Sequence, residues 1–152
     1  MKLALTLAAV AATYWVGGHL MLTETESLSQ RFFFIRDVKP GERFPRWSYV
    51  TFGLSHPYFK KGKRELLTKM VRCEAGETLK VTDQREYFCN GEFLGRSFER
   101  DSKGVVLPQF RYKGQIPSGK LFVMGQHERS FDGRYFGLID EREVVKVAYP
   151  LF

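Results

Sequence analysis

The sequence has few of the residues that bind metal ions. Its 152 residues include only two cysteines, Cys73 and Cys89, and three histidines, His19, His56 and His127. A zinc site needs three or four such ligands at short, regular spacings, and these five residues are too few and too scattered to supply them. We therefore expect no metal site and no cofactor.

Internal repeats, low-complexity tracts and an excess of acidic residues are also missing. Hydrophobic residues make up 43% of the chain and include 14 Phe and 7 Tyr, a composition too apolar for wholesale disorder. The length is typical of one globular domain. The 24 Lys and Arg outnumber the 17 Asp and Glu, and the resulting net charge of +7 favours anionic partners, either lipid headgroups or nucleic acid.

One long uncharged run is present, at the N-terminus. Residues 3–22 carry no formal charge, and fifteen of these twenty are apolar. At ~1.5 Å per residue, such a helix spans ~30 Å of hydrocarbon. We therefore predict a transmembrane anchor over residues 1–22 and an extracytoplasmic domain over residues 23–152. The alternative is a signal peptide cleaved at Ala9-Val10-Ala11.

The sequence around this run also predicts its orientation. Lys2 is the single basic residue before it, and the positive-inside preference keeps Lys2 in the cytoplasm. The other 23 basic residues then lie across the membrane. The expected location is a bacterial inner membrane, crossed once, with the working domain in the periplasm.

Short β-prone runs separated by turn residues make up the rest of the chain. Predicted strands cover residues 31–36, 49–52, 66–73, 79–81, 87–89, 93–94, 105–107, 120–124, 134–139 and 144–148. Turn signals include Asn90-Gly91 and Asp132-Gly133. The pattern predicts a mainly β fold, an antiparallel β-sandwich or irregular barrel. No helix start signal is evident, although residues 63–72 also fit an amphipathic helix.

The predicted strand at residues 66–73 places a lysine among apolar neighbours. Leu67, Lys69, Val71 and Cys73 share one face because side chains alternate along a strand. A lysine in such a place most often extends its ammonium to water along its apolar stem.

The two cysteines bracket a predicted pair of antiparallel strands. Because the periplasm is oxidising, we predict a disulfide between Cys73 and Cys89. It would close a loop of about fifteen residues and stabilise the fold by ~3 kcal/mol in the chain-entropy description. The alternative is a pair of buried thiols.

Three polar stretches occur in a fixed order along the chain. Thr25-Glu26-Ser27-Leu28 follows the apolar run, Lys69-Met70-Val71 precedes Gly76-Glu77, and a third stretch extends from Gly125 to Gly137. Together with the turns at Asn90-Gly91 and at residues 116–119 and the ending at residues 148–152, they resemble type I signal peptidases, the serine/lysine membrane peptidases. They are most similar to the TraF-like pilin-maturation peptidases of conjugative plasmids.

The resemblance implies a serine protease in which Ser27 is the nucleophile and Lys69 the general base. A serine hydroxyl must lose its proton during attack, and a lysine accepts that proton only when its amine is neutral. Burial on the apolar face shared with Leu67 and Val71 would lower the lysine pKa from ~10.4 by several units, as this chemistry requires. The Thr25 hydroxyl and the Ser27 backbone N–H are implied to form the oxyanion hole.

The third stretch contributes the supporting residues that the resemblance implies. Ser130 would hydrogen-bond and orient the Lys69 amine. Asp132 and Arg134 would pair and hold the loop that carries Ser130. Gly133 stands where the family often has a serine, and this departure removes one hydroxyl from the neighbourhood of the lysine.

A second departure leaves two candidate nucleophiles. Ser29 stands where the family usually has a proline, so its hydroxyl competes with that of Ser27. We prefer Ser27, because Thr25 two residues earlier and Leu28 directly after it match the family's nucleophile motif.

The implied reaction is removal of a signal or propeptide from an exported preprotein. The small size of the chain and its anchor-to-serine spacing favour a conjugative pilin precursor as substrate. Acylated Ser27 would react with water or with the pilin's own amino terminus, which gives a cyclic product. The expected partners are the preprotein, membrane lipids and other conjugation proteins, and not nucleic acid, for which the sequence has no recognisable module. The alternative is a catalytically inactive membrane-anchored β-domain that assembles a conjugation or secretion complex.

Overall fold

The computed structural model describes residues 17–23, 27–59 and 62–151. Its strands are β1 (Leu20–Leu22), β2 (Phe32–Asp37), β3 (Tyr49–Ser55), β4 (Arg64–Cys73), β5 (Thr78–Val81), β6 (Glu86–Cys89), β7 (Glu92–Arg96), β8 (Lys113–Gln115), β9 (Lys120–Met124), β10 (Ile139–Asp140) and β11 (Val144–Pro150). The helix α2 (Gly133–Phe136) lies between β9 and β10, and the 3-10 helix η2 (Glu141–Glu143) leads into β11.

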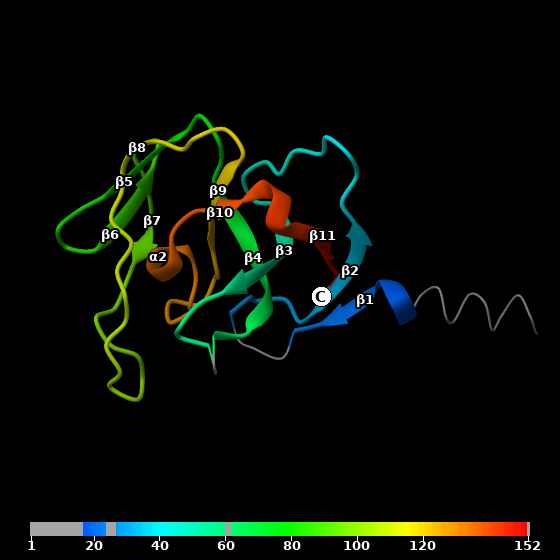
Figure 1. Cartoon of the computed structure of the whole chain (residues 1–152), viewed down its shortest axis with the longest axis horizontal. Coiled ribbons are helices and arrows are strands. Elements are labelled where there is room, and N and C mark those ends of the chain that lie inside the picture. Colours follow the sequence, from blue (N-terminus) through cyan, green and yellow to red (C-terminus); the bar gives the residue numbers. More distant parts are fainter. Residues whose placement is uncertain (1–16, 24–26, 60–61, 152) are drawn as a thin grey trace, which may run out of the picture.

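These strands form two antiparallel sheets in the described part of the chain. The larger sheet has the order β1-β2-β11-β3-β4-β9-β10, and the smaller has the order β7-β6-β5-β8. The smaller sheet lies at the left of Figure 1 and the larger at the right, with β4 and β9 toward the smaller sheet. The prediction of a mainly β, antiparallel fold is confirmed.

Strand β9 shows why the core forms where it does. Four of its five residues are buried. Leu121 and Val123 pack into one apolar cluster with residues of β3, β4 and β11. Phe122 and Met124 pack into a second cluster, with residues of the smaller sheet. A strand that is buried on both faces must be apolar at every position, and this accounts for its uninterrupted hydrophobic sequence.

The β4 segment is a strand over its whole length, so the alternative of a helix at residues 63–72 is wrong. It pairs with β3 from Arg64 to Met70 and with β9 from Met70 to Cys73. Lys69, Val71 and Cys73 are all buried, as the alternation of side chains predicts. From Met70 onward β4 lies between β3 and β9, whereas Lys69 pairs only with β3 and is 4% exposed.

A disulfide connects the two sheets. Cys73 at the end of β4 is bonded to Cys89 at the end of β6, and their Cα atoms are 5.8 Å apart. Both residues are fully buried. The crosslink fixes the smaller sheet against the strand that carries Lys69.

The N-terminal run differs from the prediction in its last residues. Leu20–Leu22 form β1, which pairs with Phe32–Phe34 of β2, so the prediction of a membrane helix is wrong for these three residues. Strand β2 provides hydrogen-bonding partners for the backbone of these residues. A short apolar segment forms a strand as readily as a helix when such partners are present. Of the remaining residues, 17–19 are helical, and residues 1–16 of the predicted anchor lie outside the described part. Among the described residues, none of the helices has the length and apolarity needed to cross a bilayer.

Two predicted strands are also absent from the described structure. Residues 134–139 are occupied mainly by α2, because the Asp132 carboxylate accepts a hydrogen bond from the Arg134 backbone N–H and caps the helix. Residues 105–107 form no strand and make only one isolated bridge, between Val106 and Arg100. Val105 and Val106 are exposed, and their β propensity does not produce a strand because no neighbouring strand pairs with them.

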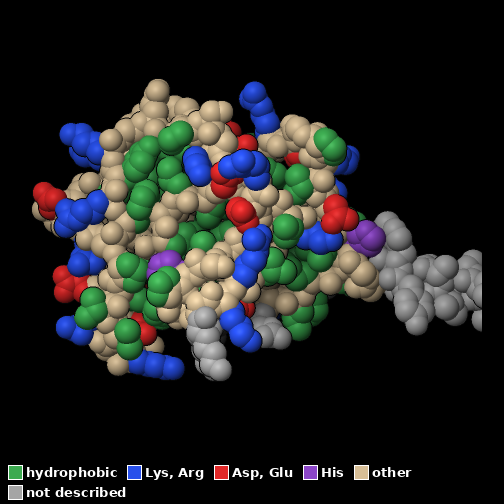
Figure 2. All heavy atoms as spheres, viewed as in Figure 1, with side chains coloured by type: hydrophobic (Ala, Val, Ile, Leu, Met, Phe, Trp, Pro, Cys, Tyr) green, Lys and Arg blue, Asp and Glu red, His purple; other side chains and the backbone are tan. Residues whose placement is uncertain are grey.

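The charged side chains are distributed over the surface. Figure 2 shows Lys and Arg side chains spread around the visible face, with Asp and Glu side chains among them. Many are paired, as in the Arg46–Glu92 and Arg64–Glu143 ion pairs. The net positive charge therefore does not form a single stripe on this face.

Candidate active site

Lys69 lies within β4, opposite Val50 of β3, and is only 4% exposed. Burial lowers the pKa of Lys69 to about 8; the charge of Asp132 opposes this shift and that of Arg134 favours it. At pH 7 an amine with this pKa is neutral in about one molecule in ten. Its Nζ donates a hydrogen bond to Ser130 Oγ at 2.9 Å. The residue is therefore a lysine that can both lose and accept a proton near neutral pH.

A buried ion pair holds the loop that carries Ser130. Asp132 and Arg134 have side chains that are 0% and 2% exposed, and Oδ2 of Asp132 lies 2.8 Å from Nη2 of Arg134. The same carboxylate oxygen accepts the Gly125 backbone N–H at 2.8 Å. Arg134 also donates to the backbone oxygens of Ser130 and Arg96. Because buried charges need partners on every side, this pair fixes both ends of the loop between β9 and α2.

Ser27 is brought to this loop from the other end of the sequence. Its carbonyl oxygen accepts the Gln126 backbone N–H at 2.7 Å. A Cβ atom at Gly125 would lie 2.8 Å from the same Ser27 oxygen and would overlap Ser130 Oγ. Gly125 therefore allows the Ser27 backbone and Ser130 to approach one another. The Ser27 backbone and Ser130 are therefore neighbours, and Ser130 in turn contacts the Lys69 amine.

The two candidate nucleophiles, Ser27 and Ser29, differ in their surroundings. Leu28 is buried in an apolar cluster that fixes the chain directly after Ser27. Ser29 is exposed, and its hydroxyl is 2.9 Å from the side-chain oxygen of Gln126 and 2.9 Å from that of Gln30. The Ser29 hydroxyl is thus held by surface amides. Thr25, predicted to be part of the oxyanion hole, lies outside the described residues.

Gln126 contacts the segment of Ser27, which the sequence alone did not predict. Its backbone N–H holds Ser27, while its side-chain oxygen also accepts the backbone N–H of Ser29 at 2.9 Å. The residue therefore fixes the segment of the nucleophile on the segment of Ser130. Its one signal in the sequence is its position directly after Gly125, in the third polar stretch.

The Gly133 departure has a steric reason. A Cβ atom at this position would lie 2.5 Å from the Val123 backbone oxygen and 2.9 Å from the Phe122 ring. There is no space for a hydroxyl here. The contact to the Lys69 amine comes instead from Ser130.

A groove of about 390 Å³ leads to Lys69. One wall is formed by Met21, Leu22 and Thr23, and the other by residues 65–69 of β4, with Leu28 and Phe59 completing it. Strand β1 pairs only with β2, and β4 before Met70 pairs only with β3. Both walls therefore present backbone groups that no described strand occupies.

One group of possible metal ligands occurs among the described residues. Cys73, Glu77 and Cys89 place one ligand atom each within 4.8 Å of one another. Both sulfur atoms belong to the disulfide and are not thiolates. These three residues are therefore a disulfide with a carboxylate beside it. The Glu77 carboxylate accepts the backbone N–H of Glu74.

Comparison with known proteins identifies the family. The family model described as "Signal peptidase, peptidase S26" matches residues 2–151. Signal peptidase I V of Bacillus subtilis (strain 168) is 35% identical over 100 residues, which cover 59% of this chain and 59% of that protein's length. A crystal structure of a signal peptidase I from Enterococcus faecalis V583 superposes with a TM-score of 0.42 and 22% identity, over 68% of this chain and 94% of the other. Because the family model matches nearly every residue, the chain belongs to the signal peptidase family, peptidase S26.

Proposed function

We propose that the chain is a membrane-anchored serine endopeptidase that removes a signal or propeptide from an exported preprotein. The observation that carries this proposal is the buried amine of Lys69, which donates to Ser130 beside the backbone of Ser27. Membership of the signal peptidase family supports the same reaction. In this proposal Ser27 is the nucleophile and Lys69 is the general base.

The groups around Ser27 suit acyl transfer. The Ser27 hydroxyl attacks the scissile carbonyl carbon while its proton passes to the neutral amine of Lys69. The tetrahedral intermediate then breaks its C–N bond, the Lys69 ammonium protonates the leaving amine, and the acyl group remains on Ser27. The Ser27 backbone N–H and the Thr25 hydroxyl donate to the oxyanion. Because one N–H of Lys69 is directed to Ser130, the amine is oriented for the exchange.

The groove indicates how a substrate would bind. An extended peptide between β1 and β4 would pair its backbone with the free edges of both strands, the mode known as strand addition. The groove side chains that such a peptide would meet include Leu22, Leu66 and Leu67. These favour apolar side chains on the substrate, and Lys69 at the end of the groove marks the position of the scissile bond.

The proposed substrate is a conjugative pilin precursor, and the proposed location is the periplasmic side of a bacterial inner membrane. Exposed apolar side chains of β1 and β2, among them Leu20 and Phe32, lie at the end of the segment predicted to be the anchor and on the strand paired with it. Contact with lipid would cover them. The acyl group on Ser27 then passes to water or to the amino terminus of the pilin.

The test is co-expression of the full chain with a pilin precursor. Ser27→Ala, Lys69→Ala and Lys69→Arg should each abolish maturation, the last because a guanidinium does not give up its proton at working pH. Ser29→Ala and Lys80→Ala are the matched controls, since both residues are exposed, and they should process normally. Normal processing by Ser27→Ala or by Lys69→Ala would reject the proposed dyad.

The mass of the mature pilin distinguishes the two acceptors. Transfer to the pilin's own amino terminus yields a product that lacks one water relative to the hydrolysed chain. If the unaltered chain leaves every precursor intact and yet copurifies with conjugation proteins, the inactive assembly domain is the correct function.

A further inference from the structure

A cluster of aromatic rings surrounds Phe131, the residue directly after Ser130. In the described part of the chain, five rings lie with their centres 4.2–5.8 Å from that of Phe131. They come from the loop after β3 and from α2, and they belong to His56, Tyr58, Phe59, Tyr135 and Phe136. Aromatic pairs favour a few relative orientations, so neighbours of this kind fix the Phe131 ring in one position.

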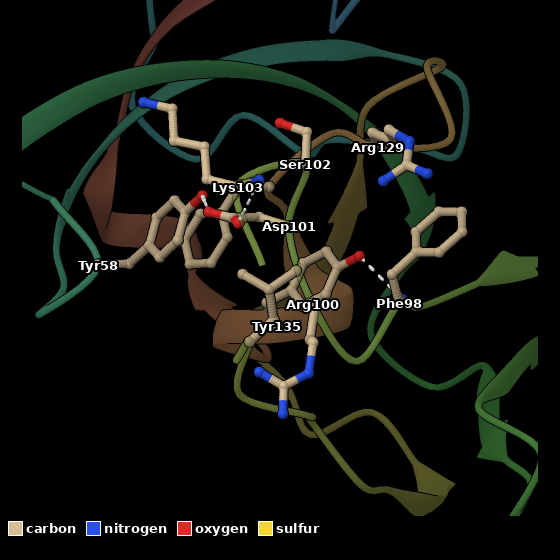
Figure 3. A pocket seen from close by; sticks show the side chains of 10 residues that line it. Tyr58, Phe98, Arg100, Asp101, Ser102, Lys103, Arg129 and Tyr135 are labelled. Carbon is tan, nitrogen blue, oxygen red and sulfur yellow. Dashed lines mark hydrogen bonds between the residues drawn. The ribbon is translucent and has the colours of Figure 1, made fainter. Parts of the chain in front are cut away.

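Two of these rings stack on Phe131 and are themselves oriented by hydrogen bonds. The ring of Tyr58 lies 4.2 Å from that of Phe131, and the ring of Tyr135 lies 5.4 Å from it. Figure 3 shows the Tyr58 hydroxyl donating to the Asp101 carboxylate. It also shows the Tyr135 hydroxyl accepting the backbone N–H of Phe98. The Phe131 ring therefore contacts one buried ring, that of Tyr135, and one ring at the surface, that of Tyr58.

This ring cluster is separate from the apolar core. Phe131 is only partly buried and belongs to none of the three clusters of buried apolar residues in the described part of the chain. Tyr58 and Phe59 do not belong to them either. Replacing Phe131 or Tyr58 should therefore leave the packing of the core unchanged, so that the variants fold.

The position of Ser130, next to this cluster, allows little movement. The Ser130 hydroxyl oxygen accepts a hydrogen bond from Nζ of Lys69 at 2.9 Å. A Cβ atom at Gly125 would overlap the same oxygen. A displaced Ser130 would therefore either lose its contact with Lys69 or press on Gly125. A misplacement of about 1 Å at a catalytic site can lower the rate about 100-fold.

The backbone on both sides of Ser130 is held in place. Its N–H donates to the carbonyl oxygen of His127 at 3.0 Å, and its own carbonyl oxygen accepts from Arg134 at 3.2 Å. The peptide group that joins Ser130 to Phe131 is planar, and it fixes the distance between their Cα atoms at about 3.8 Å. A shift of Phe131 therefore moves Ser130 with it.

The ring cluster also contacts the groove that leads to Lys69. Phe59 lines this groove together with Lys69, and its ring lies 5.6 Å from that of Phe131. Phe131 is not one of the described residues that line the groove. A change at Phe131 should therefore affect the position of Ser130 and not the surface that binds the peptide.

We propose that Phe131 is a positioning residue, and that the rings packed around it hold Ser130 at hydrogen-bond distance from the Lys69 amine. The inference rests on the proposed peptidase function, in which Lys69 is the general base. Phe131 itself touches neither the peptide nor the reacting atoms. It acts through Ser130, which orients the amine that accepts the proton.

The first test measures kcat and KM of the full chain with a peptide that contains an Ala-x-Ala cleavage site. Phe131→Leu should lower kcat about 10- to 100-fold and leave KM within about twofold, because only the position of Ser130 changes. Tyr58→Leu should lower kcat in the same way, whereas Tyr58→Phe, which keeps the ring, should retain it.

Phe93→Leu is the matched control. Phe93 is 54% exposed, and its ring lies 5.5 Å from that of Phe88 on the smaller sheet, so this variant also removes an exposed ring from a ring pair. It should keep kcat. Equal values of kcat for Phe131→Leu and Phe93→Leu would overturn the positioning role.

A double-mutant cycle distinguishes positioning from a general loss of structure. If Phe131 acts through Ser130, the double variant Ser130→Ala/Phe131→Leu should have the same kcat as Ser130→Ala alone. If the two losses multiply, Phe131 acts independently of Ser130, and this would overturn the proposal.

A failure of the proposed function gives a different result. If the unaltered chain cleaves no peptide, the ε-carbon resonance of Lys69 in the ¹³C-lysine-labelled chain still reports the contact of Lys69 with Ser130. Phe131→Leu should move this resonance in the same direction as Ser130→Ala, and Phe93→Leu should leave it in place. This result would support the positioning role without the peptidase. An unchanged resonance in Phe131→Leu would overturn it.

Discussion

Replacement of Asp132 by asparagine should destabilise the protein much more than the same replacement in a similar ion pair at the surface. The Asp132 carboxylate is fully buried and accepts four hydrogen bonds, one from the Gly125 N–H and three from Arg134. An asparagine of the same shape keeps one acceptor oxygen and loses the charge. The Arg134 guanidinium, 2% exposed, then remains in the interior without a counterion.

The size of the effect follows from this burial. Removing one partner of a buried ion pair costs about 3–5 kcal/mol, because the other charge stays desolvated. A domain is stable by about 5–15 kcal/mol, so Asp132→Asn should remove a large part of the free energy of unfolding. With a urea m-value of about 2 kcal/mol per M, the midpoint of unfolding should fall by about 2 M.

Asp140 provides the control. It caps η2 as Asp132 caps α2, and it also binds the arginine two residues later, through the Arg142 backbone N–H and guanidinium. The side chains of its partners Arg142 and Lys120 are 89% and 41% exposed, so water replaces the lost carboxylate and Asp140→Asn should lower the urea midpoint far less than Asp132→Asn. Equal shifts of the urea midpoint for Asp132→Asn and Asp140→Asn would refute the reasoning.

Three further predictions concern the site and the crosslink. The kcat/KM for peptide cleavage should rise about tenfold per pH unit up to about pH 8 and then level off, because only the neutral form of Lys69 accepts the proton; a constant value between pH 6 and pH 9 would contradict this. Gly125→Ala should lower kcat/KM by about 100-fold, because the added methyl group displaces Ser130. Gly18→Ala is the control and should have no effect, since its added methyl group meets nothing within 4 Å. Equal activities of the two variants would contradict the close approach of Gly125 to Ser130. Replacing both Cys73 and Cys89 by serine should lower the free energy of unfolding by about 3 kcal/mol, measured in urea, and a loss below 1 kcal/mol would contradict a stabilising crosslink.

The strands that were predicted correctly are those with a partner on each side or a buried face. The stretch from Lys120 to Met124 is a strand with the predicted bounds, and β4 contains the whole of the predicted residues 66–73. In these segments the apolar residues stand at the positions that the fold buries. Val105 and Val106 have the same residue types on an exposed loop, so composition there carried no information about pairing.

Short elements were missed where a single contact decides the conformation. The four residues of α2 depend on the Asp132 cap, and the sequence Asp132-Gly133 was interpreted as a turn. Leu20–Leu22 belong to an apolar run of helical length, and only their pairing with β2 makes them a strand. Tertiary contacts of this kind override local propensity.

The candidate site was predicted in part from residues and in part from resemblance. The alternation along β4 was enough to place Lys69 on the buried face. The contact of Lys69 with Ser130 joins positions 61 residues apart, and that of Ser29 with Gln126 joins positions 97 residues apart. Such distant approaches have no local signal. The resemblance suggested the first, and nothing in the sequence suggested the second.

The pKa of Lys69 decides whether this residue can act as the general base. It can be measured by following the ε-carbon resonance of Lys69 through a pH titration of the full chain labelled with ¹³C-lysine, with Lys69→Met to assign the signal. Burial of the amine should give a midpoint of about 8. A midpoint at 10 or above would contradict it, because the amine would then be a charged, solvated lysine that cannot take a proton from Ser27.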